Sequence, residues 1–314
     1  MEDIQRTQIL EAMAALVAER GVAGVTVADV IARTGVSRRA FYEQFPDRNS
    51  CLVAAFDLGV ERAAARMMPA YASQRRWRDG IRAALAEGLR FLDAEPSLGR
   101  LLVVHSLGYV ELARRRAETQ ALLWNVVDRG RSEGSVGRSE PPPVVAEGVV
   151  GAVLAVIQTR LLAQDAQPPD ERPSLEVFGS LMSLIVLPYL GPSAAQRELL
   201  RPAPAPLSSE RRPSLPVSRF EDNGLRLTYR TGRVLSAIAQ YPGASNREVA
   251  ERAGIVDQGQ ISKLLTRLER AGAITNLSEG TARGAPNAWS LTELGKRIER
   301  GVEHRLGRAP RAGS

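Results

Sequence analysis

The stretch "TVADVIARTGVSRRAFYEQFPDR", Thr26 to Arg48, decides the fold of the N-terminal region. Thr26 can cap a short helix, and Asp29, three residues later, suits the first turn of that helix. Gly35 can adopt the left-handed conformation that ends a helix. Ser37 is the next N-cap candidate, so two short helices joined by a tight turn are expected. This spacing predicts a helix-turn-helix.

The second helix of the pair combines apolar and cationic residues that would not occur together in a core helix. One face is expected to point inward and carries Val36, Ala40, Phe41 and Phe45; the other carries Arg38, Arg39, Tyr42, Glu43 and Gln44. The major groove of DNA admits one helix and offers acceptors to arginine and paired groups to glutamine. The outer face therefore predicts contact with DNA, and the alternative is a solvated helical pair inside an all-helical protein.

Composition indicates a globular protein with an acidic partner. The length of 314 residues is enough for two or three domains. The chain is 44% hydrophobic and 25% charged, which is typical of a globular protein. The net charge of +7 favours nucleic acid as a partner. Residues 1–70 carry a net charge of −1, however, and residues 221–314 carry +5. The N-terminal prediction therefore depends on where its arginines lie and not on bulk charge.

Several classes of protein are not expected. The single cysteine, Cys51, rules out a disulfide framework and fits a reducing cytoplasm, and with only two histidines a Cys/His zinc site is not expected. No signal peptide is recognised, and the longest apolar run, residues 149–157, is too short to cross a bilayer. No nucleophile–base arrangement, phosphate-binding glycine loop or metal cluster suggests an enzyme, and no cofactor is predicted.

The chain is expected to be mainly α-helical, with three domains. The expected boundaries are 1–70 for the helix-turn-helix domain, 71–200 for an all-helical domain, 201–219 for a proline-rich linker, 220–305 for a winged helix with a small β wing, and 306–314 for a disordered tail. The predicted helices at 144–162 and 175–190 are apolar nearly all round and must be buried. Residues 144–190 are therefore predicted to form a homodimer interface, and the alternative is a monomeric core.

The C-terminal region repeats the pattern of two short helices joined by a tight turn that is predicted for the N-terminal region. The nine-residue spacing from Thr26 to Gly35 recurs from Ser245 to Gly254, and Ser245 with Glu248 has the form of a capping box. A leucine-rich stripe and two short strands around a glycine-containing loop complete the pattern. The residues predicted to reach DNA are Gln258, Gly259, Gln260, Ser262, Lys263, Thr266 and Arg267 on the helix and Arg283 in the loop. Trp289 is expected to belong to the core of the wing.

Residues 6–60 resemble the N-terminal DNA-binding domain of the TetR family of bacterial regulators. The order of a first helix, a glycine, the core "TVADVIARTGVS" and a short aromatic helix carries the resemblance. The chain departs from it with Arg48 in place of the usual lysine and Gln44 in place of a common aromatic or histidine. The resemblance implies DNA contacts at Thr26, Ser37, Arg38, Arg39, Ala40, Tyr42 and Arg48, and Gln44 joins them as an outward-facing residue.

Two weaker resemblances extend to the rest of the chain. Residues 75–191 look like the ligand-binding and dimerisation domain of such regulators, and residues 225–305 are similar to a MarR-type winged helix. These resemblances imply a dimeric repressor that a small apolar effector releases from its operator. The candidate effector contacts are Phe91, His105, Trp124 and Gln158, whose alternative role is ordinary core packing. The run from Arg114 to Arg116 is expected to be a solvated helix face, and Cys51 a small buried side chain.

The alternative function keeps DNA binding but removes the effector. In that hypothesis the protein is a DNA-binding adaptor that works without a ligand, and its winged helix binds a protein partner.

Overall fold

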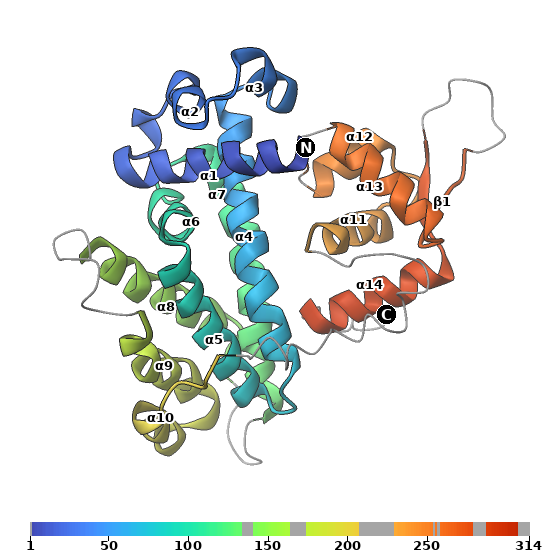
Figure 1. Ribbon diagram of the computed structural model, residues 1–314. Coiled ribbons are helices and arrows are strands. Elements are labelled where there is room, and N and C mark those ends of the chain that lie inside the picture. Colours follow the sequence, from blue (N-terminus) through green and yellow to red (C-terminus); the bar gives the residue numbers. More distant parts are fainter. Residues whose placement is uncertain are drawn as a thin grey trace. The chain divides into compact units, whose positions relative to one another are not determined.

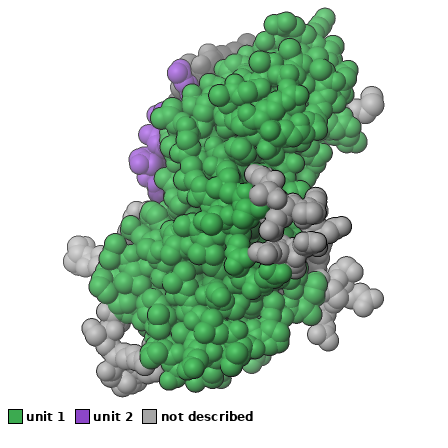
Figure 2. Space-filling view, turned by 90° about the vertical axis from the view of Figure 1, so that its left-hand side faces the viewer, with its two compact units in different colours: residues 1–211 green, residues 212–314 purple. Residues whose placement is uncertain are grey.

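The computed structural model describes residues 2–133, 141–163, 174–206, 229–253, 255, 258–278 and 287–306. The chain divides into two compact units, Met1–Arg211 and Arg212–Ser314, which are coloured separately in Figure 2. Both units are built mainly from helices, and each is described by itself below.

The N-terminal segment of unit 1 has the predicted order of short helices (Figure 1). Its elements are α1 (Glu2–Arg20), η1 (Val22–Gly24), α2 (Val27–Thr34) and α3 (Arg38–Gln44). Helix α1 buries an apolar stripe that consists of Ile9, Met13, Leu16 and Val17. Helix α1 packs against α2 and against the long helix α4 (Arg48–Ala72), so the segment is anchored through this stripe.

The remainder of unit 1 is a body of packed helices. Its further elements are α5 (Trp77–Ala94), α6 (Pro96–Arg100), η2 (Leu101–His105), α7 (Val110–Asp128), η3 (Arg129–Glu133), α8 (Val144–Ala163), η5 (Ser174–Val177), α9 (Phe178–Leu190) and α10 (Pro192–Leu200). Helix α4 begins directly after the helix-turn-helix segment and packs against α5 and α7 (Figure 1). One helix therefore belongs both to the N-terminal segment and to the body.

Helix α10 is an element that the sequence analysis missed. Gly191 adopts a positive φ of 79° and Pro192 takes the first helical position, where its missing N–H costs nothing. The helix buries Glu198, which forms an ion pair with the buried Arg82 of α5. Arg82 and Arg90 of α5 also donate hydrogen bonds to carbonyl oxygens of residues 202 and 204. The first residues of the predicted linker are therefore held against α5.

Helix α8 is less buried than the sequence predicts. Helix α9 buries most of its apolar side chains, but α8 leaves Val144, Val156 and Leu162 exposed. This 20-residue helix is also long and apolar enough to cross a membrane by length and composition alone, although core helices of other proteins pass the same test. The expectation drawn from the run at 149–157 is therefore corrected. The apolar pattern extends beyond that run, and 28% of the 18-residue apolar window of the helix is buried within this chain.

Unit 2 consists of helices around a two-stranded sheet. Its elements are α11 (Tyr229–Gln240), α12 (Asn246–Ala253), α13 (Gln258–Arg270), β1 (Ile274–Asn276), β2 (Trp289–Leu291) and α14 (Glu293–Leu306). The strands are antiparallel, with Ile274 opposite Leu291 and Asn276 opposite Trp289. The predicted stripe on α13, Ile261, Leu264, Leu265 and Leu268, is buried in the core of this unit.

Two local predictions for unit 2 are confirmed. Trp289 is buried in the core, and its indole Nε1 donates a hydrogen bond of 2.6 Å to Oδ1 of Asn246. Ser245 and Glu248 form the predicted capping box. The Ser245 N–H donates to the Glu248 carboxylate at 2.8 Å, and the Glu248 N–H donates to the Ser245 hydroxyl oxygen at 3.3 Å. Gly254, Asp257, the loop around Arg283, most of the predicted linker and the predicted tail lie outside the described residues.

Candidate nucleic-acid interface

The turn between α2 and α3 is built by local contacts that the sequence predicts. The Oγ1 atom of Thr26 accepts a hydrogen bond from the Asp29 N–H at 3.2 Å, and the Asp29 carboxylate accepts one from the Thr26 N–H at 2.8 Å. Hydrogen bonds from Thr26, above all that of its hydroxyl, lower the pKa of Asp29. Gly35 ends α2 with a φ of 71°, a left-handed conformation that suits glycine. Both predicted helix ends are confirmed.

Helix α3 separates its apolar and polar residues as predicted. Phe41 is fully buried and Phe45 nearly so, with their ring centroids 5.7 Å apart. The guanidinium of Arg6 lies 4.4 Å from the centre of the Phe45 ring and donates a hydrogen bond to the Gln44 carbonyl. The inner face of α3 is therefore fixed both by aromatic packing and by α1.

The outer face of α3 presents cationic and aromatic groups to solvent. Arg38, Arg39 and Tyr42 are exposed, whereas Ala40 and Gln44 are half-buried. The Nε atom of Arg39 lies 2.9 Å from Oε1 of Glu43, and the Arg39 side chain is 90% exposed. An exposed ion pair of this kind contributes little to stability. The arginine can therefore exchange its glutamate for a phosphate at small cost.

The two N-cap hydroxyls differ in what they can offer to a phosphate. Thr26 also donates its own proton to Asp29 at 2.6 Å, so both sides of its hydroxyl are used in the cap. The Oγ atom of Ser37 accepts from the Ala40 N–H at 3.1 Å, and no described acceptor takes the proton of Ser37. Of the two, Ser37 is better placed to donate a hydrogen bond to DNA.

Arg48 is held by protein acceptors, a geometry that the resemblance does not suggest. Its Nε atom donates to the Val25 carbonyl at 2.6 Å, Nη2 donates to the Val22 carbonyl, and Nη1 donates to the Tyr109 hydroxyl at 3.0 Å. Arg48 thus joins the loop before α2 to the residue that precedes α7. These contacts favour a structural role for Arg48 over a phosphate contact.

Sequence reasoning missed the partners of Arg48 in this junction. Asn49 accepts a hydrogen bond from the Tyr109 hydroxyl at 2.9 Å, and its Nδ2 atom lies 3.4 Å from Oε1 of Glu111. About 60 residues separate the two sides of this contact. No periodicity or motif in the sequence connects residues at such a distance.

The candidates on α13 lie on the face opposite its buried stripe. Gly259, Ser262, Lys263, Thr266 and Arg267 are exposed. The side chains of Gln258 and Gln260 and the whole of Arg283 lie outside the described residues. The exposed set therefore contains two of the predicted cations, Lys263 and Arg267.

The four candidate effector contacts come from four elements of unit 1. Phe91 on α5 is buried, with the guanidinium of Arg66 at 5.7 Å from its ring centre. His105, Trp124 and Gln158 lie on η2, α7 and α8 and are half-buried. Phe91 therefore belongs to the packed core, and the other three remain candidates for contact with a ligand.

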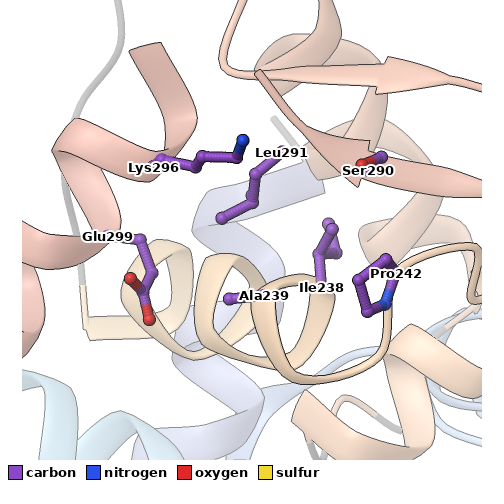
Figure 3. Close-up of a pocket in the computed structure, with 7 residues that line it drawn as sticks. All are labelled: Ile238, Ala239, Pro242, Ser290, Leu291, Lys296 and Glu299. Carbon is purple, nitrogen blue, oxygen red and sulfur yellow. The ribbon is translucent and has the colours of Figure 1, made fainter. Parts of the chain in front are cut away.

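A pocket of about 300 Å³ lies in unit 2 between α11, β2 and α14 (Figure 3). Its lining combines apolar or small residues with two charged ones: Ile238, Ala239, Pro242, Ser290, Leu291, Lys296 and Glu299. The Nζ atom of Lys296 forms an ion pair of 2.8 Å with Glu293. The pocket is open at one side and lined by elements other than α13.

Comparison with known proteins agrees with the geometry of the N-terminal segment. Residues 9–55 match the family model described as bacterial regulatory proteins, tetR family. No curated protein matches the chain.

Solved structures share the fold at low sequence identity. The fatty acid degradation regulator FadR from Bacillus halodurans is 16% identical with a TM-score of 0.51, covering 58% of this chain and 94% of that one. FadR from Bacillus subtilis, solved with stearoyl-CoA, is 16% identical with a TM-score of 0.50 over 57% and 97%. A TetR family regulator from Marinobacter aquaeolei VT8 is 21% identical with a TM-score of 0.45 over 58% and 95%. The match to the tetR family of bacterial regulatory proteins therefore covers residues 9–55, and the part of the chain that the two FadR structures cover shares their fold.

Proposed function

We propose that this protein is a DNA-binding transcriptional regulator whose helix α3 enters the major groove. One observation carries the proposal: Arg38, Arg39 and Tyr42 are exposed on one face of α3, while Phe41 and Phe45 hold the other face in the core. The N-terminus of α3, capped by Ser37, adds a partial positive charge that attracts phosphate.

The chain contains a matched pair of arginines that tests this proposal. Arg39 pairs with Glu43 at 2.9 Å on α3, and Arg114 pairs with Glu118 at 3.1 Å on α7; both pairs span four residues on a helix surface. Binding to a duplex selected from a random-sequence pool is measured over a range of salt concentrations. Arg39→Gln should reduce the slope of log K against log salt by about 0.9, the value for one phosphate contact. Arg114→Gln should leave the slope unchanged, and equal slopes for both variants would contradict the proposal.

The regulator is proposed to act as a homodimer through residues 144–190. The exposed side chains of Val144, Val156 and Leu162 on α8 and of Leu187 on α9 support this, because apolar surface of this kind is stabilised when a partner covers it. The two N-terminal domains would read half-sites about 34 Å apart, one turn of DNA. Val156→Glu should convert the dimer to a monomer in sedimentation experiments. Leu277→Glu, at an exposed leucine of unit 2, is the control that should stay dimeric.

Release by a small, largely apolar effector completes the proposal. The half-buried residues His105, Trp124 and Gln158 come from different elements of one helical body, where a ligand could change how the helices pack. An effector that binds the free protein better than the DNA-bound form lowers DNA affinity through linkage. Titration of the selected duplex with and without candidate effectors tests this step, and a DNA affinity that no bound ligand changes would contradict repression by release.

Unit 2 is proposed to be a second, winged-helix DNA-binding module. Its order of three helices, a two-stranded sheet and the exposed cations Lys263 and Arg267 on α13 supports this role. Arg267→Gln should lower the salt slope of DNA binding by about 0.9, whereas Arg297→Gln on α14 should not.

A second candidate function is that of an adaptor that binds DNA without an effector. The pocket in unit 2 favours it, because an open, mostly apolar pocket away from α13 could receive a side chain of a protein partner. An unchanged salt slope for Arg267→Gln would favour this function over DNA binding by unit 2.

A further inference from the structure

Helix α7 carries an inward stripe that contains an arginine. Leu112, Arg116, Thr119 and Leu123 follow the spacing i, i+4, i+7 and i+11, which places them along one side of the helix. Leu112 is fully buried, and the other three are half-buried. The position of Arg116 on this side is not that of a solvated charge.

The three consecutive arginines of α7 have three different environments. Arg114 is 68% exposed and pairs with Glu118. Arg115 is buried and pairs with Asp57 of α4 at 3.3 Å and with Glu118 at 3.6 Å. The expectation of a solvated run is therefore wrong for Arg115, because one turn of helix points successive side chains in different directions.

Among the described residues, Arg116 is the arginine of this run for which no carboxylate serves as a counter-charge. Its Nη1 atom is buried without a hydrogen-bond partner, and none of the described carboxylates forms an ion pair with it. Burial lowers the pKa of Arg116. A buried N–H of a guanidinium without an acceptor is costly, because its hydration is lost and not replaced. An anion bound beside Arg116 would accept a hydrogen bond from this Nη1 atom and offset the cost.

Helix α7 shares its packing partners with a π-helical segment. Helix α7 packs against α4 and α8, and the π-helical segment η2, which ends at His105, packs against the same two helices. Short π-helical segments occur frequently at functional sites. The unpaired cation and the π-helical segment are independent observations on the same body of helices.

We propose that Arg116 recognises the anionic group of the effector, and that the effector is an amphipathic organic acid. The carboxylate would accept hydrogen bonds from the guanidinium, and the apolar part would lie against the half-buried Leu123 on the same side of α7. This inference rests on the proposed effector control and sharpens it, since a purely apolar effector would leave Arg116 without an acceptor.

Pairs of acids and neutral analogues test the proposal on the full chain without DNA. The probes are octanoate, decanoate and benzoate, each compared with octanol, decanol and benzyl alcohol by calorimetry. At least one acid should bind wild-type protein more tightly than its alcohol, and Arg116→Gln should weaken that acid about tenfold or more, the usual effect of losing a hydrogen bond to a charged group. Arg116→Lys should keep the preference for the acid in part. Arg114→Gln, the matched control, should keep it fully.

Thermal unfolding of the ligand-free variants gives a second readout. Arg116→Gln should leave Tm unchanged or raise it, because it removes an uncompensated charge, whereas Arg115→Gln should lower Tm because it removes the buried ion pair with Asp57. The proposal is overturned if no acid binds, if acids and alcohols bind alike, or if Arg116→Gln lowers Tm as Arg115→Gln does. A protein that binds the acid but no DNA would instead contradict the proposed regulator and leave this inference standing.

Discussion

Replacing Arg48 with methionine separates a structural role from a DNA contact. Arg48 donates to the carbonyls of Val22 and Val25, two buried residues, and to the hydroxyl of Tyr109. Methionine keeps the apolar stem of the side chain but removes every donor. Arg48→Met should therefore leave two carbonyl oxygens of the segment before α2 without their partner.

The size of the effect follows from these contacts. A hydrogen bond from a charged donor contributes about 1.5–3 kcal/mol, and Arg48 is half-buried, so water can replace part of the loss. We expect Arg48→Met to lower the free energy of unfolding by about 2–4 kcal/mol, since two such bonds to buried residues are removed. An exposed pair such as Arg39–Glu43 contributes little to stability, so Arg39→Gln should have a much smaller effect.

Urea denaturation and the salt dependence of DNA binding together test this reasoning. Arg48→Met should lower stability and, at temperatures where it is folded, keep the salt slope of wild-type protein. Arg39→Gln should keep stability and lower the slope. If Arg48→Met is as stable as wild type and loses about 0.9 from the slope, the arginine contacts phosphate and the structural reasoning is refuted.

Three further predictions concern stability, reactivity and pH. Glu198→Gln leaves the buried Arg82 without its counter-charge and should cost about 3–5 kcal/mol in urea denaturation; a loss below about 1 kcal/mol would contradict a buried pair. Burial raises the pKa of Cys51 to about 12, so its thiol should react with a disulfide reagent at pH 8 only after unfolding, and fast reaction of native protein would contradict this. Hydrogen bonds from Thr26 lower the pKa of Asp29, so this carboxylate stabilises the fold above its ordinary pKa of about 3.9 and the contribution is lost as pH falls through the folded value. Asp29→Asn should therefore make the fall of Tm in acid less steep, and an unchanged profile would count against the cap.

Much of the candidate interface could be predicted because it depends on neighbours in the sequence. The Thr26 cap, the left-handed Gly35 and the Ser37 cap each involve residues within four positions of one another, where local geometry decides the contact. The inward position of Phe41 and the outward position of Arg39 follow from helical periodicity.

Contacts between distant residues could not be predicted in the same way. Arg48 and Tyr109 are 61 positions apart, and Arg82 and Glu198 are 116 apart. Helix α10 was not predicted because it is short, follows a glycine and begins with a proline, and both residues also mark loops. The partly exposed α8 shows a related difficulty. An apolar pattern indicates that a helix surface will be covered, but it does not indicate which part of the protein or which partner covers it.

The sequence by itself determined the caps and the turn of the helix-turn-helix and the inner and outer faces of α3. Helix caps, left-handed glycines and the spacing of apolar residues depend on residues within one or two helical turns, so they can be predicted from the sequence. Only the tertiary structure decided which charges have partners: Arg115 meets Asp57, Arg48 meets backbone carbonyls, and Arg116 meets none of the described carboxylates. Whether a charged side chain finds a partner depends on which helix packs beside it, and three adjacent arginines of one helix therefore have three different environments.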